Sequence, residues 1–336
     1  MKLHPIFTDR MVLSANKPLR VFGEGDKAVT VSLNGQTAVA IPCEGKWMAE
    51  LSPMTYGGPY TLTVTDGDST VTCVDVHIGE VYLFAGQSNM QFRLADSSTP
   101  PEEWRGEDRL RFFTCDRVTN DEPFCAADGW TTCARETAGQ RSALAYYIGQ
   151  GLVQKKGVAI GAVVSYHGAS IIESWLPDGL LKGLGIDIPL EQKHIDHWYE
   201  AYVDWNKDGV LYENLMRQTA PFAFSGVVWY QGESDACVAE GAVYAQELTA
   251  LIDQWRADYK DEQLPFVVVQ IADFLPTGEP EGWKLVQAAQ MKVGETVPFV
   301  KTVVSRDISE NDDIHPRTKD KLAGRIVDAL TELTAR

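Results

Sequence analysis

The pattern of hydrophobic and polar positions changes once along the chain, near residue 76. Before that point, short runs alternate between apolar and polar residues, as at 29–33 and 60–65. Asn34-Gly35 follows the first of these runs and is a strong signal for a two-residue hairpin turn. Short strands at this spacing predict a small β-sandwich-like domain over residues 1–76. This region has no cluster of catalytic residue types, so we expect it to support the structure or to shape a substrate groove.

From residue 77 onward, apolar runs alternate with amphipathic segments. Several runs are apolar on both faces, which is typical of a parallel sheet covered by helices on each side. The strand candidates lie at residues 80–85, 111–115, 159–165, 225–230, 265–271 and 299–304. Helical periodicity predicts helices at 141–155, 241–258 and 283–293 and a last helix that begins at Pro316. We therefore predict an α/β domain with a mainly parallel sheet over residues 77–336.

The composition narrows the class of protein and the class of partner. Of the 336 residues, 44% are hydrophobic and 23% are charged, as in soluble globular proteins. The chain has no apolar stretch of the ~20 residues that a membrane-spanning helix needs. The net charge of −17 repels phosphate backbones and anionic lipids, so we expect neither a nucleic acid nor a membrane as partner.

The N-terminus and the cysteines bear on the cellular compartment, and the histidines bear on metal binding. The N-terminus lacks the apolar core of a signal peptide, which predicts a cytoplasmic protein for the chain as given, or a secreted or periplasmic one if a leader was removed. Six cysteines without a Cys-x-x-Cys pair are expected to be reduced, although Cys125 could bridge to Cys115 or Cys133 in an oxidising compartment. His194 and His197 lack further convincing ligands, so we expect no metal there.

The first candidate for chemistry is Ser88, in the segment Gly86-Gln87-Ser88-Asn89-Met90 directly after the first strand of the α/β region. A buried strand that ends in Gly-x-Ser places the hydroxyl at the tip of a sheet, where a helix can begin. A serine there can attack a carbonyl, and its backbone N–H can bind the resulting oxyanion. The alternative is a helix N-cap, a position that favours Ser and Asn.

Two further strand ends carry possible oxyanion donors, because ligands bind beyond the carboxyl ends of parallel strands. Gly168 follows the strand at 159–165, and its N–H could donate to an oxyanion. A plain tight turn is the alternative. Gln231 follows the strand at 225–230, and its side-chain amide could be another donor or an ordinary polar group at a strand end.

The segment Asp312-Asp313-Ile314-His315-Pro316 offers a base. Asp312 and His315 are three residues apart, so the carboxylate can fix the orientation and tautomer of the imidazole, which then accepts the serine proton. The order Ser…Asp…His also occurs in α/β-hydrolases. Their nucleophile elbow, however, has a second glycine where Met90 stands, so we expect a different α/β fold.

These motifs together resemble the SGNH-hydrolase superfamily and, within it, the sialate O-acetylesterase group and the sixth carbohydrate esterase family, which includes acetylxylan esterase-like proteins. The resemblance rests on four ordered motifs, at residues 86–90, 168–175, 229–235 and 312–316. It continues into the N-terminal β region at residues 4–7, 11–13 and 57–60, and so covers nearly the whole chain. One departure is Gly168-Ala169-Ser170, which stands where Gly-Gly-Thr is usual.

The resemblance implies a three-layer α/β/α SGNH (flavodoxin-like) domain in which Ser88 is the nucleophile, His315 the base and Asp312 the orienting acid. It implies an oxyanion hole formed by the Ser88 N–H, the Gly168 N–H and the Gln231 side chain. No metal or organic cofactor is required by this chemistry. Further candidates for substrate-binding or supporting roles are Gln87, Asn89, His167, Glu233, Arg93 and Trp175.

Some of these further candidates have competing interpretations. Glu233 is expected to hold the Gln231 loop by a hydrogen bond. Arg93 could meet a sialic-acid carboxylate or be an exposed surface arginine. Trp175 could stack on a sugar or pack in the core.

The predicted function is the removal of O-acetyl groups from an acetylated carbohydrate, sialic acid or a plant-type glycan, through an acetyl-enzyme. Two alternatives stay open: a non-catalytic carbohydrate-binding protein with a decayed site, and a general short-chain carboxylesterase or lipase. A glycosidase is less favoured, because Glu233 and Asp235 are two residues apart in one loop and could not easily flank a glycosidic bond.

Overall fold

The computed structural model describes residues 1–115, 128–194 and 205–335 and shows a mixed α/β protein built on an 11-stranded sheet. Seven strands follow the order β10-β9-β11-β8-β12-β13-β14, and all neighbours in this path are parallel except β10 and β9. The predicted α/β class with a mainly parallel sheet is confirmed. These strands are β8 (Thr70–Gly86), β9 (Glu107–Thr114), β10 (Thr131–Cys133), β11 (Ile160–Tyr166), β12 (Gly226–Tyr230), β13 (Phe266–Val269) and β14 (Val300–Val303).

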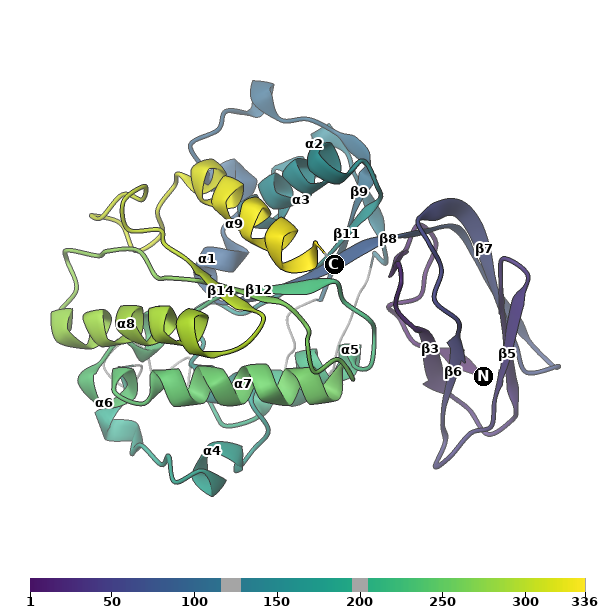
Figure 1. The fold of residues 1–336 in the computed structure, drawn as a ribbon, viewed down its shortest axis with the longest axis horizontal. Helices are drawn as coiled ribbons and strands as arrows, with labels where there is room; N and C mark the ends of the chain where they lie inside the picture. The colour runs from purple at the N-terminus through teal and green to yellow at the C-terminus, as the bar shows by residue number, and fades with distance from the viewer. Residues whose placement is uncertain (116–127, 195–204, 336) are drawn as a thin grey trace.

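Long helices pack on the strands, with α3 and α9 on one side and α7 and α8 on the other (Figure 1). Their bounds are α3 (Ala143–Lys156), α7 (Tyr244–Asp258), α8 (Pro280–Thr296) and α9 (Lys319–Thr334). Shorter helical segments are α1 (Ser88–Gln91), α2 (Arg135–Ala138), α4 (Leu180–Gly183), α5 (Arg217–Thr219), α6 (Val238–Gly241), η1 (Leu94–Asp96), η2 (Pro101–Glu103), η3 (Ile172–Trp175), η4 (Leu190–Gln192), η7 (Tyr212–Met216) and η8 (Glu233–Asp235).

Several predicted helices differ from the structure at their ends. The helix predicted at 241–258 is α7, which begins three residues later, at Tyr244, whereas the short helix α6 before it ends at Gly241. The last helix begins at Lys319 and not at Pro316. The Thr318 N–H donates to the Glu310 carboxylate at 3.2 Å, and this contact holds the chain in a non-helical turn before the helix starts.

The N-terminal β region contains a three-stranded sheet, β1-β3-β6, and strands that pair with the first half of β8. In Figure 1 this region lies to one side of the helices, at the right of the view. Its strands are β1 (Lys2–Leu3), β2 (Val12–Ser14), β3 (Leu19–Glu24), β4 (Val29–Leu33), β5 (Gln36–Ala40), β6 (Lys46–Leu51) and β7 (Gly57–Thr65). The proposed boundary between residues 76 and 77 lies inside β8, which runs unbroken through it.

Strand β8 has different neighbours along its length. Its first half pairs with β7 and β2, and its second half pairs in parallel with β11 and β12. Every residue from Ile78 to Gly86 is buried. A strand enclosed on both faces and both edges has a fixed end, and Ser88 follows that end.

The structure describes only some of the residues on which the predictions about cysteines and metal binding depend. Of the described cysteines, Cys43, Cys73, Cys133 and Cys237 are free thiols. Cys125, and with it both proposed bridges, lies outside the described residues, as does His197. Among the described helices, none combines the length and the apolar character needed to cross a membrane.

Candidate active site

Ser88 and His315 form the centre of the candidate site. The fold brings them together across 227 positions of sequence, with His315 Nε2 2.8 Å from Ser88 Oγ. Ser88 is the first residue of α1, so its backbone N–H has no partner within that helix. The Phe92 ring stacks on the His315 imidazole at a centroid distance of 6.3 Å. The geometry suits transfer of the hydroxyl proton to the imidazole.

Gly86 explains how β8 presents Ser88. Its φ of +142° is open to glycine, and a Cβ added there would lie 2.0 Å from the Tyr230 carbonyl oxygen. The Gly86 carbonyl accepts the His167 N–H, and the Gln87 N–H donates to the Tyr230 carbonyl. The ends of β8, β11 and β12 are therefore tied together directly beneath the nucleophile.

Gly168 borders the same hydroxyl. A Cβ added to Gly168 would lie 3.8 Å from Ser88 Cβ and 3.2 Å from Gln91 Oε1, so the backbone there faces the reacting group. The next residue, Ala169, has a φ of +55°, in the left-handed region that favours glycine. This conformation accounts for the usual glycine at that position in the pattern that the chain resembles.

Gln231 is completely buried and engaged at both ends of its amide. Its Nε2 donates to the Ser170 carbonyl at 2.8 Å and to the Asp235 carboxylate, and its Oε1 accepts the Tyr244 hydroxyl at 2.7 Å. Donation to an oxyanion would require one of the two Nε2 hydrogen bonds to be exchanged. The predicted place of Gln231 in the oxyanion hole stays a prediction.

The two acidic residues before His315, Asp312 and Asp313, lie in different environments. Asp313 Oδ1 accepts the backbone N–H of His315 at 2.8 Å. Asp312 is exposed, and within the described residues no hydrogen bond joins it to the His315 ring. The role of Asp312 as orienting acid therefore stays a prediction that rests on its spacing.

A buried polar group lies behind the nucleophile and joins three segments. Asn89 donates to Glu233 Oε1 at 2.6 Å and to the Ile314 carbonyl at 2.9 Å, and its Oδ1 accepts from Lys319 Nζ at 2.6 Å. The Lys319 ammonium also lies over the Phe92 ring, 5.0 Å from its centroid. Asn89 thus fixes the helix of the nucleophile to the loop of the base.

The buried polar group around Asn89 shifts the pKa values of its members and of His315. Burial lowers the pKa of Lys319 from 10.5 to about 7, against the opposing effect of the Glu233 charge, and burial raises the pKa of Glu233. Burial first, and then the charge of Lys319, lowers the pKa of His315 below its ordinary value, while Asp313 acts in the opposite direction. A lowered pKa keeps His315 in the neutral form that a general base needs.

Sequence reasoning did not identify Lys319. The signal was present, because the predicted buried face of the last helix, Leu322, Ala323 and Ile326, extends back by one turn to residue 319. A lysine on a buried helix face requires a partner and marks a position to examine.

The remaining candidates lie as follows. Gln87 is buried, and its Oε1 accepts the Gly232 N–H at 3.2 Å. Gln87 therefore holds the Gln231 loop together with Glu233, which accepts a hydrogen bond from Asn89. Arg93 is exposed and paired with Asp96 through Nε at 2.8 Å.

The two aromatic candidates are buried. His167 packs against Trp205 at a centroid distance of 4.6 Å. Trp175 has no exposed surface and packs edge-to-face on Trp229, so it belongs to the core in this structure.

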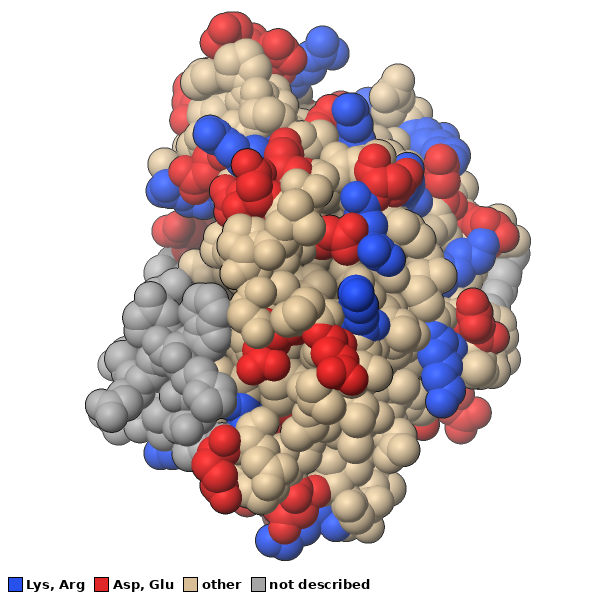
Figure 2. Space-filling model, turned by 90° about the vertical axis from the view of Figure 1, so that its left-hand side faces the viewer, with Lys and Arg blue, Asp and Glu red and all other residues tan. Residues whose placement is uncertain are grey.

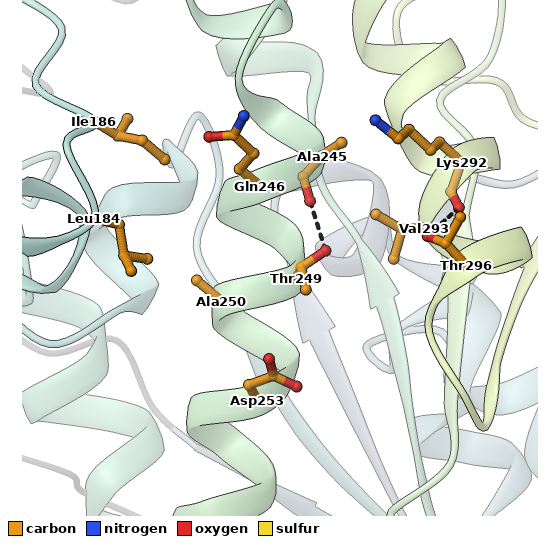
Figure 3. A pocket seen from close by; sticks show the side chains of 10 residues that line it. All are labelled: Leu184, Ile186, Ala245, Gln246, Thr249, Ala250, Asp253, Lys292, Val293 and Thr296. Carbon is orange, nitrogen blue, oxygen red and sulfur yellow. Dashed lines mark hydrogen bonds between the residues drawn. The ribbon is translucent and has the colours of Figure 1, made fainter.

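One pocket and one face of the surface were compared with the candidate active site. A pocket of about 390 Å³ lies between α7, α8 and the segment at 184–186. Figure 3 shows the side chains that line it, among them Ala245 and Val293. It shares no residue with the Ser88 group. On the face in Figure 2, acidic and basic side chains are interspersed, so that face has no extended area of one sign.

A serine hydroxyl paired with an imidazole at the carboxyl end of a parallel strand is typical of serine hydrolases. Residues 78–331 match the family model described as "Carbohydrate esterase, sialic acid-specific acetylesterase". The chain belongs to this carbohydrate esterase family, as its resemblance to sialate O-acetylesterases predicted.

Named relatives agree with the family. The chain is 27% identical to a human sialate O-acetylesterase over 345 residues, which cover 91% of this chain and 65% of the human protein. It is 26% identical to a sialate O-acetylesterase from Pongo abelii, covering 83% and 59%. The chain therefore spans less than two thirds of these relatives. The crystal structure of a carbohydrate acetylesterase from Xanthomonas citri is similar with a TM-score of 0.87 and 29% identity, covering 99% of this chain and 75% of that one.

Proposed function

We propose that the protein is a serine esterase that removes O-acetyl groups from an acetylated carbohydrate. The observation that carries the proposal is the 2.8 Å contact between Ser88 Oγ and His315 Nε2, in a chain of the carbohydrate esterase family. The substrate class follows from the relatives, which are named as sialate O-acetylesterases and as a carbohydrate acetylesterase. The proposal includes a three-layer SGNH domain at 77–336 and a small β domain at 1–76.

The reaction would run as an acyl transfer through Ser88. His315 takes the Ser88 proton as Oγ attacks the acetyl carbonyl, and the N–H groups of Ser88 and Gly168 stabilise the tetrahedral oxyanion. Gln231 joins them as a third donor if it releases Ser170 or Asp235. His315 then protonates the departing sugar hydroxyl, and water repeats the sequence on the acetyl-enzyme. Asp312 orients His315.

The first test replaces the nucleophile. Ser88→Ala should lower turnover of an activated acetyl ester on the order of 10⁴-fold, because no acetyl-enzyme can form. Ser98→Ala, which changes an exposed serine nearby, is the matched control and should keep full activity. Equal hydrolysis by wild type and Ser88→Ala contradicts the serine mechanism, and an inactive wild type supports a carbohydrate-binding protein with a decayed site.

The second test concerns the substrate class. Acetate release across acetylated sialic acids and acetylated plant oligosaccharides should exceed release from simple alkyl acetates, and activity should fall steeply for acyl groups longer than acetyl. Activity that rises with acyl length instead indicates a general carboxylesterase or lipase.

A further inference from the structure

A second buried polar centre lies behind Gln231, on the side of the sheet covered by α7 and α8 (Figure 1). Four carboxylates meet there, from η3, η8, α6 and α7. At most 5% of the surface of any one is exposed, and the set, named here the carboxylate cluster, consists of Glu173, Asp235, Glu240 and Glu247. One carboxylate oxygen from each of Glu173, Asp235 and Glu240 lies within 4.8 Å of the other two. Sequence analysis did not foresee this grouping, because its members come from four separate segments.

The negative charge of the carboxylate cluster is only partly balanced by the described residues. Lys193 Nζ pairs with Glu173 Oε1 at 2.6 Å, and this is the ion pair that the structure gives for the cluster. Several buried carboxylates against one ammonium leave a large uncompensated charge, which costs free energy.

Oxygen atoms in the cluster also lack hydrogen-bond partners. Glu247 is completely buried, and among the described residues neither of its carboxylate oxygens has a hydrogen-bond partner. Its carboxylate lies close enough to Glu173, Asp235 and Glu240 to feel the charge of each. Glu173 and Glu240 each have one bonded oxygen and one without a partner. Buried carboxylate oxygens are almost always bonded, so four unbonded oxygens on neighbouring buried carboxylates indicate a ligand that accepts oxygen donors.

We propose that the carboxylate cluster binds a divalent cation, and that the cation is calcium. Carboxylate oxygens are hard ligands, and Ca²⁺ holds them at ~2.3–2.6 Å, so two ligands on opposite sides of the ion are about 4.6–5.2 Å apart. The separations within the cluster allow this arrangement. Mg²⁺ prefers a smaller octahedral site and keeps several waters, which a buried set of carboxylates does not accommodate as well. Glu173, Asp235 and Glu240 are the ligands, and the unbonded Glu247 carboxylate adds negative charge beside them.

The cation would support the neighbouring ester site without taking part in its chemistry. Asp235 accepts hydrogen bonds from the Gln231 amide and from the Ile172 N–H, the latter at 3.0 Å. Gln231 in turn holds the Ser170 carbonyl, two residues beyond Gly168. A bound ion therefore fixes Asp235, and through it the two segments that border Ser88.

The test measures binding and unfolding, so its result does not depend on esterase activity. The purified protein is treated with EGTA, dialysed, and titrated with CaCl₂ by calorimetry, and its thermal unfolding is followed with and without Ca²⁺. We expect about one Ca²⁺ per chain and a rise of several degrees in Tm. Glu247→Gln and Glu240→Gln should each weaken Ca²⁺ binding at least ~10-fold and remove most of this rise, since ligand charge tunes affinity.

Controls and contrary outcomes separate the alternatives. Glu262→Gln changes an exposed carboxylate and should bind Ca²⁺ as wild type does. In EGTA, Glu247→Gln should be at least as stable as wild type, because it removes a charge that no ion then balances. If wild type binds no metal and Ca²⁺ does not change its Tm, the proposal is overturned. The carboxylates of the cluster would then be neutralised by shared protons. A larger effect of Mg²⁺ than of Ca²⁺ would overturn the choice of cation.

Discussion

At the scale of single residues, Asp312 and Asp313 are both close enough in sequence to serve His315. An acid that orients a catalytic imidazole accepts a hydrogen bond from its Nδ1. Asp313 already uses one oxygen on the backbone N–H of His315, which fits a role in shaping the loop. Asp312 is free of that task and lies three residues before the imidazole, about one helical turn away.

Replacing each acid by its amide distinguishes the two roles. Asp312→Asn should lower kcat roughly 10²–10⁴-fold, because the imidazole loses its orienting charge. Asp313→Asn keeps an oxygen for the His315 N–H and should cost much less. The measurement is kcat on an activated acetyl ester, with circular dichroism to confirm folding. A larger loss in Asp313→Asn would transfer the orienting role to Asp313.

The residues of the site differ in how far sequence could predict them. Ser88 and His315 could be predicted, because Ser88 follows a buried strand and His315 belongs to a recognisable motif before the last helix, and the structure places the two side chains 2.8 Å apart. The partners of Gln231 could not, because they depend on how Ser170, Asp235 and Tyr244 pack around it in three dimensions.

At the scale of elements, Lys319 connects α9 to α1. It is the first residue of α9, and its ammonium meets Asn89 of α1 beside Glu233 of η8. Its pKa of about 7 leaves it largely protonated over the range in which a histidine with a lowered pKa titrates. Its charge therefore disfavours imidazolium and helps to keep His315 neutral.

The effect of this connection can be measured in the pH profile. Activity requires neutral His315, so kcat/KM should rise with pH through the pKa of His315, with a midpoint below 6.5. Lys319→Met removes the repelling charge, raises that pKa and should move the acidic limb to higher pH by about one unit or less. Lys321→Met, an exposed change on the same helix, should leave the limb in place. An unchanged or lower midpoint in Lys319→Met would refute the electrostatic role.

The sequence predicted the buried strands better than it predicted the ends of the helices. All six strand candidates of the α/β region are strands, because apolar runs between polar turns leave little choice. Helix ends were predicted less well. The break between α6 and α7 and the late start of α9 depend on contacts such as that between Thr318 and Glu310, which periodicity does not contain.

At the scale of the whole molecule, the N-terminal β region and the α/β region are joined by more than one strand. The buried Arg111 donates to the Asp75 carbonyl at 2.6 Å and to the Arg10 carbonyl at 2.9 Å. The Trp130 indole donates to the Ile6 carbonyl at 2.7 Å. Such contacts make the two regions depend on each other for stability.

This dependence predicts one cooperative unfolding transition in calorimetry. Arg111→Met should lower the free energy of unfolding by about 2 kcal/mol, since two part-buried hydrogen bonds from a charged donor are lost. Arg109→Met, an exposed change two residues earlier, should stay within about 0.5 kcal/mol of wild type. Two separate transitions in the wild type would show that the regions fold independently.

The unbroken course of β8 also restricts how this protein can be re-engineered. Residues 76 and 77 are consecutive steps of one pleat, so a chimera cannot be cut there as at a flexible linker. One inserted residue would turn every later side chain of the strand to the opposite face and exchange Val81 and Leu83 with Tyr82 and Phe84. A replacement for the N-terminal region must therefore supply the first half of this strand in register, or the nucleophile of the second half will be misplaced.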